Sequence, residues 1–84
     1  VLYLVGPRGT ELVVAATGGA VPADFAGSLV PFGSRVSGWV AANRVSVRNS
    51  DATLEFMEFS RSARTVLMAP LMAGEILTGV IGAT

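Results

Sequence analysis

The chain begins with two short apolar runs separated by a turn. Residues 1–6 are rich in valine and leucine and include Tyr3, and residues 11–17 are again mostly apolar. Pro7 and Gly9 lie between the two runs. Short β-forming runs on either side of a proline and glycine turn are typical of a β-hairpin. We therefore expect the fold to begin with a hairpin.

A connection rich in glycine and proline follows over residues 18–30. Its composition allows at most one helical turn, which we place at residues 22–25. We interpret this connection as an excursion that crosses one face of the sheet.

The spacing of apolar positions then changes to that of a helix. Val36, Trp39 and Val40 are related as i, i+3 and i+4, which predicts a short amphipathic helix over residues 34–43. Ser34 can cap its N-terminus, and Asn43 can adopt the left-handed conformation that ends many helices.

The second half of the chain predicts a strand, a short helix and a second hairpin. Residues 45–48 alternate like a half-buried strand, and residues 49–51 (Asn-Ser-Asp) can cap a helix. The apolar side chains of this helix are expected to face inward and its polar ones to face solvent: Leu54, Met57 and Phe56 or Phe59 inward, and Glu58, Arg61 and Ser62 outward. Residues 65–72 and 76–84 form the hairpin around a turn at 73–75.

These strands differ from those of a sheet with one face in water. Such strands alternate apolar and polar residues, but four segments here are apolar at both odd and even positions: 1–5, 12–16, 66–71 and 76–81. Both faces of the sheet are therefore expected to be covered. The internal helices and the connection can cover one face at most. We interpret residues 1–84 as a single domain whose other face is covered by terminal helices missing from this chain, or by a second subunit.

Composition and charge exclude several classes of protein. Of the 84 residues, 51% are hydrophobic, and six acidic residues balance six basic ones, all arginine. A disordered tail is more polar, and a nucleic-acid binder carries a basic excess. A domain of this size buries only about 60% of the surface of its unfolded chain. The apolar content therefore favours a partner surface or further covering segments.

The longest apolar stretch, residues 65–84, is the one candidate for a membrane span. It contains Pro70 and Glu75, and a charge in the centre of a span costs roughly 2.5–3.5 kcal/mol. We therefore favour a hairpin and no membrane insertion, with a membrane hairpin as the alternative. No signal peptide is visible, and with no cysteine present we expect a cytoplasmic location.

Catalytic chemistry has few candidates, because the chain contains neither cysteine nor histidine. We expect no enzyme activity and no metal site. Glu55 and Glu58 could chelate a cation or act as an acid/base pair, with Asp51 nearby, but a solvent-exposed helix face that pairs Glu58 with Arg61 is favoured, and Asp51 is favoured as a cap. The glycines of residues 79–82 lack a phosphate-loop context and indicate close backbone packing.

Aromatic residues from the connection and both helices converge on one region. They can line a concave apolar pocket, or they can form a filled core, and both interpretations stay open. The candidate ligand-binding residues are the apolar Phe25, Phe32, Trp39, Val40, Phe56 and Met68, with Asn49 and Asp51 as polar contacts.

Two blocks of sequence resemble a known family. Residues 30–44 contain a proline, a glycine turn and the run Ser-Gly-Trp-Val-Ala at 37–41, followed by a short strand and the Asn-Ser-Asp of 49–51. Residues 69–71 and 74–80 complete the second block. These blocks, in this order and after a two-strand start, resemble the GAF domain over essentially the whole chain.

The resemblance implies an α+β fold with a central antiparallel sheet of the GAF/PAS-like, profilin-like topology. It also implies short helices over one face, a ligand cavity between them and the sheet, and terminal helices that form a homodimer interface. Family members that hold bilin or haem, or that reduce methionine sulfoxide, use cysteine or histidine, which this chain lacks. The cyclic-nucleotide pattern of other members is echoed only faintly, by Asn43, Arg44 and Phe56 or Phe59.

The function expected from this resemblance is a non-catalytic sensor module of a bacterial signalling protein. Its output partner would be a histidine kinase, a diguanylate cyclase, an HD-type phosphodiesterase or a transcriptional regulator. An unidentified small-molecule effector is expected, with no cofactor and no nucleic acid. The alternative is a ligand-free structural or dimerisation module.

Overall fold

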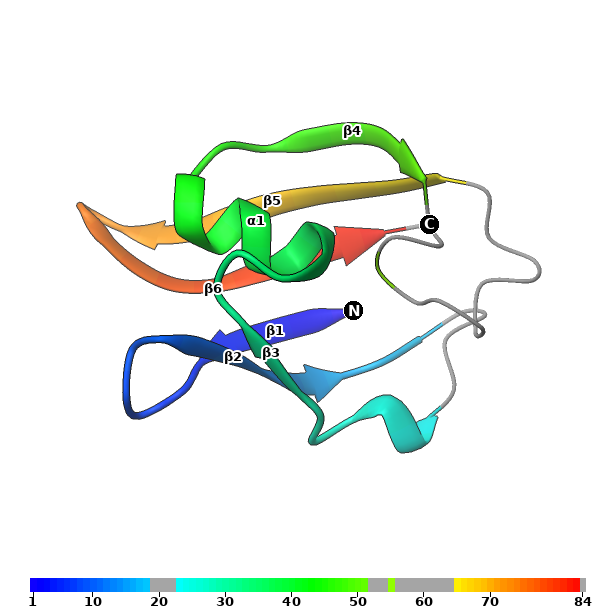
Figure 1. The fold of residues 1–84 in the computed structure, drawn as a ribbon, viewed down its shortest axis with the longest axis horizontal. Helices are drawn as coiled ribbons and strands as arrows, with labels where there is room; N and C mark the ends of the chain where they lie inside the picture. The colour runs from blue at the N-terminus through cyan, green and yellow to red at the C-terminus, as the bar shows by residue number, and fades with distance from the viewer. Residues whose placement is uncertain (19–22, 52–54, 56–64, 84) are drawn as a thin grey trace.

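The computed structural model describes residues 1–18, 23–51, 55 and 65–83, except the side chains of residues 23 and 49–51. This part of the chain forms an α+β fold with six antiparallel strands and a nine-residue α-helix (Figure 1). The elements follow in this order: β1 (Leu2–Val5), β2 (Glu11–Ala16), the 3₁₀ turn η1 (Ala23–Phe25), β3 (Leu29–Pro31), α1 (Arg35–Asn43), β4 (Val47–Asp51), β5 (Thr65–Ala73) and β6 (Ile76–Ala83).

The sheet has the strand order β3-β2-β1-β6-β5-β4. The first and last strands are central neighbours, and Tyr3 of β1 lies between Val14 of β2 and Val80 of β6. Both predicted hairpins, β1–β2 and β5–β6, are confirmed, as is a single helical turn at η1. Residues 65–83 of the apolar stretch thus form a pair of antiparallel strands joined by a turn. No helix in the described ranges is long and apolar enough to cross a membrane.

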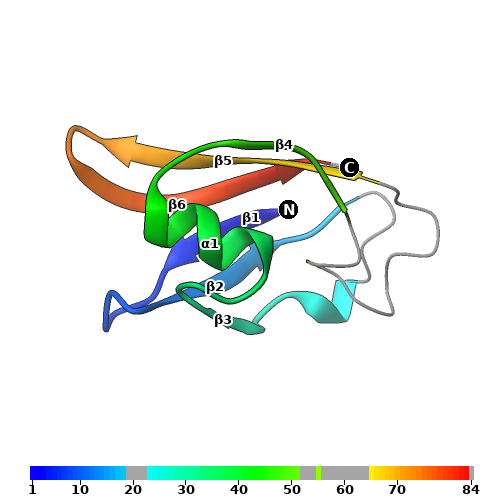
Figure 2. The ribbon, with the colours of Figure 1, turned by 45° about the horizontal axis from the view of Figure 1, so that its top comes forward.

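Helix α1 lies across one face of the sheet and packs against β5 and β6 (Figure 2). Its buried residues are Val36, Ser37, Gly38, Val40 and Ala41. A Cβ atom on Gly38 would overlap the backbone oxygen of Pro31, so glycine lets the helix approach the end of β3. Burial of this side of the helix leaves the Trp39 side chain exposed to solvent.

Two expectations about α1 need correction. Trp39 is 44% exposed and does not belong to the core. The buried side of the helix contains Val36, Ser37 and Val40 and leaves Trp39 in contact with solvent. The left-handed residue at the C-terminus is Arg44 and not Asn43, with φ of 58° and a backbone N–H that donates to the oxygen of Val40. The left-handed position therefore lies one residue further along the chain than predicted.

Strand β4 also differs from the prediction. The alternation placed a strand at residues 45–48 and helix caps at 49–51, whereas the strand spans Val47–Asp51. Ser50 and Asp51 pair with Val66 and Thr65, so the long β5 strand supplies backbone hydrogen bonds that local capping would otherwise have to provide. Most of the predicted second helix, with Leu54, Phe56, Met57, Glu58, Phe59, Arg61 and Ser62, lies outside the described residues.

The core lies between α1 and the sheet. It is built from the α1-facing side chains of the strands together with Phe25 and the buried face of the helix. Gly79 and Gly82 confirm the predicted close packing, since a Cβ on Gly79 would overlap the backbone oxygen of Tyr3 and one on Gly82 would lie 2.7 Å from the Met68 sulfur.

The opposite face of the sheet carries a row of apolar side chains. Leu4, Leu67 and Ile81 are between 46% and 49% exposed. Their strand positions alternate with the buried Tyr3, Met68 and Val80, which places them on the side away from α1. In the described residues, the prediction of two covered faces is therefore met on one face only.

Candidate functional site

A buried carboxylate joins the N-terminal end of α1 to the sheet. Glu55 is fully buried and accepts hydrogen bonds from the Tyr3 hydroxyl (2.6 Å), the Ser37 hydroxyl (2.6 Å) and the Ser37 backbone N–H (2.7 Å). We call Tyr3, Ser37 and Glu55 the Glu55 cluster. Ser34 makes no side-chain cap hydrogen bond. Glu55 therefore accepts the Ser37 N–H in the first turn of α1, as a capping side chain would, and its negative charge matches the positive end of the helix dipole.

The surroundings keep the Tyr3 hydroxyl protonated. Burial raises the pKa of the Tyr3 hydroxyl well above its usual range, and the neighbouring Glu55 carboxylate raises it further. Tyr3 thus remains a hydrogen-bond donor. Arg35 donates to the backbone oxygen of Glu55 at 3.2 Å, and its guanidinium carbon lies 5.7 Å from the centre of the Phe25 ring.

The prediction that Glu55 lies on a solvent-exposed helix face is wrong. Its burial is compatible with its charge because both carboxylate oxygens are hydrogen-bonded. A signal for this cluster was present in Tyr3. Its place in an apolar strand implied a buried phenol, and a buried phenol requires a polar partner.

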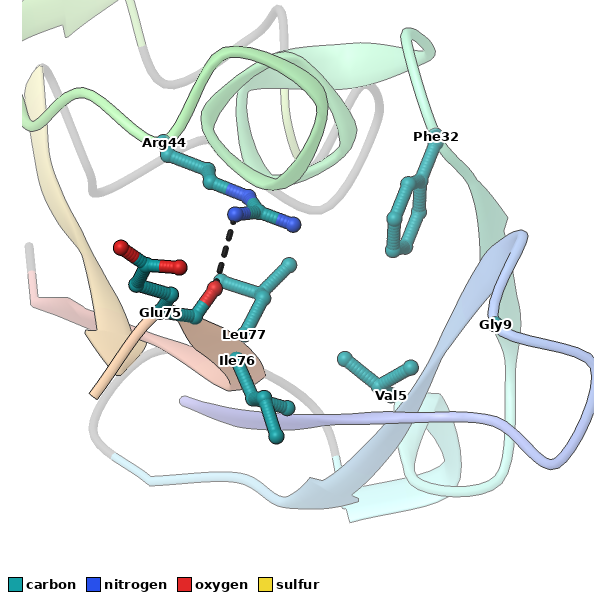
Figure 3. A pocket seen from close by; sticks show the side chains of 7 residues that line it. All are labelled: Val5, Gly9, Phe32, Arg44, Glu75, Ile76 and Leu77. Atoms are coloured by element: carbon teal, nitrogen blue, oxygen red, sulfur yellow. Dashed lines mark hydrogen bonds between the residues drawn. The ribbon is translucent and has the colours of Figure 1, made fainter. Parts of the chain in front are cut away.

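A pocket of about 320 Å³ lies at the other end of α1 (Figure 3). Strand β1, the β1–β2 turn, the residue after β3, the C-cap of α1 and the β5–β6 hairpin all contribute to it. Its lining residues are Val5, Gly9, Phe32, Arg44, Glu75, Ile76 and Leu77. We call it the Arg44 pocket.

The Arg44 guanidinium is held over the apolar floor of the pocket. One of its terminal nitrogens donates to the backbone oxygen of Glu75 at 2.8 Å. In Figure 3 the other terminal nitrogen points toward the side of the pocket where Phe32 lies. The Glu75 carboxylate points to the opposite side, away from Phe32. The pocket therefore presents apolar surface beside a cationic group with hydrogen-bonding capacity to spare.

The structure separates the candidate ligand-binding residues predicted from the sequence. Phe25, Val40 and Met68 belong to the buried core, which fits the interpretation of these side chains as core. Trp39 is exposed. Phe32 lines the Arg44 pocket.

The other three candidates are Asn49, Asp51 and Phe56. Asn49 and Asp51 lie on β4, and their side chains are outside the described part, as is Phe56. Sequence reasoning did not select Arg44 or Glu75 as ligand contacts. The signals for Arg44 were its position at the end of the predicted helix and its place in the faint echo of the cyclic-nucleotide pattern.

No family model matches the chain, and no similar curated protein or solved structure was found. Among the described residues, no three acidic side chains gather into a group that could hold a metal ion. The functional argument therefore rests on the geometry of the Arg44 pocket and the Glu55 cluster.

Proposed function

We propose that this chain is a GAF-type sensory module that binds a small effector in the Arg44 pocket and passes its occupancy to an attached output domain. The observation that carries the proposal is the pocket itself, whose volume of about 320 Å³ lies at the small end of the range for ligand sites. The antiparallel sheet with α1 packed across it supports the family assignment.

The walls of the pocket suggest how occupancy acts. Arg44 belongs to the C-cap of α1, Val5 ends β1, and Ile76 begins β6, so an occupant touches the helix and two hairpins at once. A ligand shifts a conformational equilibrium only through different affinities for the two states. The effector would therefore favour the conformation in which the C-terminal end of α1 and the β5–β6 turn are as far apart as they are in this structure.

The wider setting of the module is part of the same proposal. It is a cytoplasmic, non-catalytic domain of a bacterial signalling protein of the two-component or cyclic-dinucleotide type. It pairs with a second copy through flanking helices, and its output domain is a kinase, a cyclase, a phosphodiesterase or a transcriptional regulator.

The test is a binding screen of the 84-residue chain by two-dimensional NMR, with nucleotides and small organic acids as probes. We expect saturable shifts for the amides of Val5, Phe32 and Leu77. Ile76→Ser removes an exposed part of the wall and should weaken binding, whereas Ile81→Ser removes a comparable exposed side chain outside the lining and should not. Saturable shifts that avoid the pocket, or none at all, would reject the proposal.

The exposed face of the sheet favours the second candidate function, a ligand-free structural or dimerisation module. Leu4, Leu67 and Ile81 form an apolar surface of the kind that marks protein interfaces. This function predicts concentration-dependent association in sedimentation experiments and no saturable binding in the screen. Ile81→Ser should then weaken association, and Ile76→Ser should leave it unchanged.

A further inference from the structure

We infer that the effector of the Arg44 pocket is a compact apolar acid, whose carboxylate binds Arg44 and whose hydrocarbon part packs against Val5, Phe32 and Ile76. This inference rests on the proposed function and adds the chemical class of the ligand. It follows from the unequal way in which the two charged side chains of the pocket are placed.

The apolar half of the site is preformed. Val5 and Phe32 are partly buried and pack against the core, and Leu77 is 8% exposed, so these side chains are held in place without a ligand. Ile76 stands 70% exposed at the rim. A hydrocarbon chain in the pocket would cover this side chain, and burial of apolar surface favours binding.

The charged half selects the sign of the ligand. Arg44 carries five N–H donors, and within the described residues its side chain has one acceptor, the backbone oxygen of Glu75. That hydrogen bond fixes the guanidinium and leaves its other terminal nitrogen on the Phe32 side of the pocket (Figure 3). A carboxylate is the acceptor whose geometry and charge match this edge.

Two features of the backbone support this role for Arg44. It follows the last residue of α1 in the left-handed conformation, with φ of 58°, and its N–H donates to Val40. The side chain therefore leaves the helix at a defined point above the β5–β6 turn.

The Glu75 carboxylate faces away from Phe32, so it is poorly placed to bind an ammonium group on the ligand (Figure 3).

The experiment compares four probes of similar size by calorimetry and NMR: hexanoate, hexanol, hexylamine and norleucine. We expect hexanoate to bind best, with amide shifts at Phe32 and Leu77, and to bind about tenfold or more tightly than hexanol, as a hydrogen bond between charged groups implies. Hexylamine is expected to bind weakest, because the guanidinium repels it.

The decisive variant is Arg44→Asn, because asparagine tolerates the left-handed backbone while it removes the cation. Hexanoate affinity should fall about tenfold or more, and hexanol affinity should hardly change. Arg48→Asn is the matched control, since Arg48 is an exposed arginine on β4 outside the lining. Glu75→Gln should raise hexanoate affinity by a few fold, as it removes a nearby negative charge.

Equal binding of hexanol and hexanoate, or unchanged hexanoate binding in Arg44→Asn, would overturn the acid assignment and leave the proposed binding function standing. Tighter binding of norleucine than of hexanoate would replace the apolar acid by an amino acid, with its carboxylate on Arg44 and its ammonium group assigned to Glu75. Failure of every probe in this pocket and in the wider screen would instead reject the proposed function itself.

Discussion

The two ends of helix α1 use charge in opposite ways. At the N-terminal end the Glu55 carboxylate is fully buried and accepts three hydrogen bonds from Tyr3 and Ser37. At the C-terminal end the Arg44 side chain is exposed and, among the described residues, donates to one backbone oxygen, that of Glu75. Both charges match the helix dipole. The two charged groups differ because Glu55 is buried and hydrogen-bonded on both oxygens, whereas Arg44 is exposed and keeps N–H donors for other acceptors.

This contrast separates a structural charge from a binding charge. A buried carboxylate whose donors all come from the protein stabilises the fold and offers nothing to a ligand. The Arg44 guanidinium makes one side-chain hydrogen bond within the described residues and lies beside an open apolar pocket, so it keeps N–H donors for a ligand. Substitution of Glu55 should therefore have a large effect on stability, and substitution of Arg44 should have a large effect on ligand binding.

The largest effect on stability is expected for Glu55→Ala. The substitution leaves the Tyr3 and Ser37 donors buried without their acceptor, and at about 1–3 kcal/mol for each donor the free energy of unfolding should fall by about 2–6 kcal/mol. Urea denaturation followed by circular dichroism measures it, with the exposed Glu75→Ala as the control. A loss below about 1 kcal/mol would show that the cluster does not anchor α1.

Tyr3→Phe should have the next largest effect. It removes one hydrogen bond to the carboxylate and leaves the ring in the core, so the expected loss is about 1.5–3 kcal/mol. The double variant with Glu55→Ala should lose less than the sum of the two single variants, because both act on one hydrogen bond. Additive losses would contradict a coupled cluster.

Alkaline pH should lower the stability that the Glu55 cluster provides at the N-terminal end of α1. The pKa of Tyr3 is higher in the folded state than in the unfolded state, where it is about 10. Its contribution to the free energy of unfolding is therefore complete below about pH 10. It is lost as the pH rises above this value, at up to about 1.4 kcal/mol per pH unit. Tyr3 is the only tyrosine, so ultraviolet absorbance follows its ionisation directly. Titration near pH 10 in the folded protein would contradict this expectation.

Arg44→Asn should have the smallest effect on stability, within about 0.5 kcal/mol, since the side chain is exposed and asparagine suits the left-handed C-cap. Thermal denaturation in the absence of ligand checks it. A loss comparable to that of Tyr3→Phe would show that Arg44 is as structural as Glu55 and would remove the contrast between the two ends.

Local signals predicted much of the fold. The two hairpins follow from apolar runs on either side of turn residues, and α1 follows from the helical spacing of Val36 and Val40. The α+β class and the antiparallel sheet follow from these elements. Strand β4 was misplaced, because its residues 49–51 have good local capping chemistry and become a strand only through pairing with β5.

The two sites depend on contacts that no local pattern reports. Tyr3 and Glu55 are 52 residues apart in the chain, and Arg44 and Glu75 are 31 apart. The sequence by itself determined the two hairpins, helix α1 and the absence of cysteine and histidine chemistry, because these depend on near neighbours and on composition. Only the tertiary structure decided that Glu55 is buried, that Trp39 is exposed and that Arg44 borders a pocket, because each depends on which side of α1 meets the sheet.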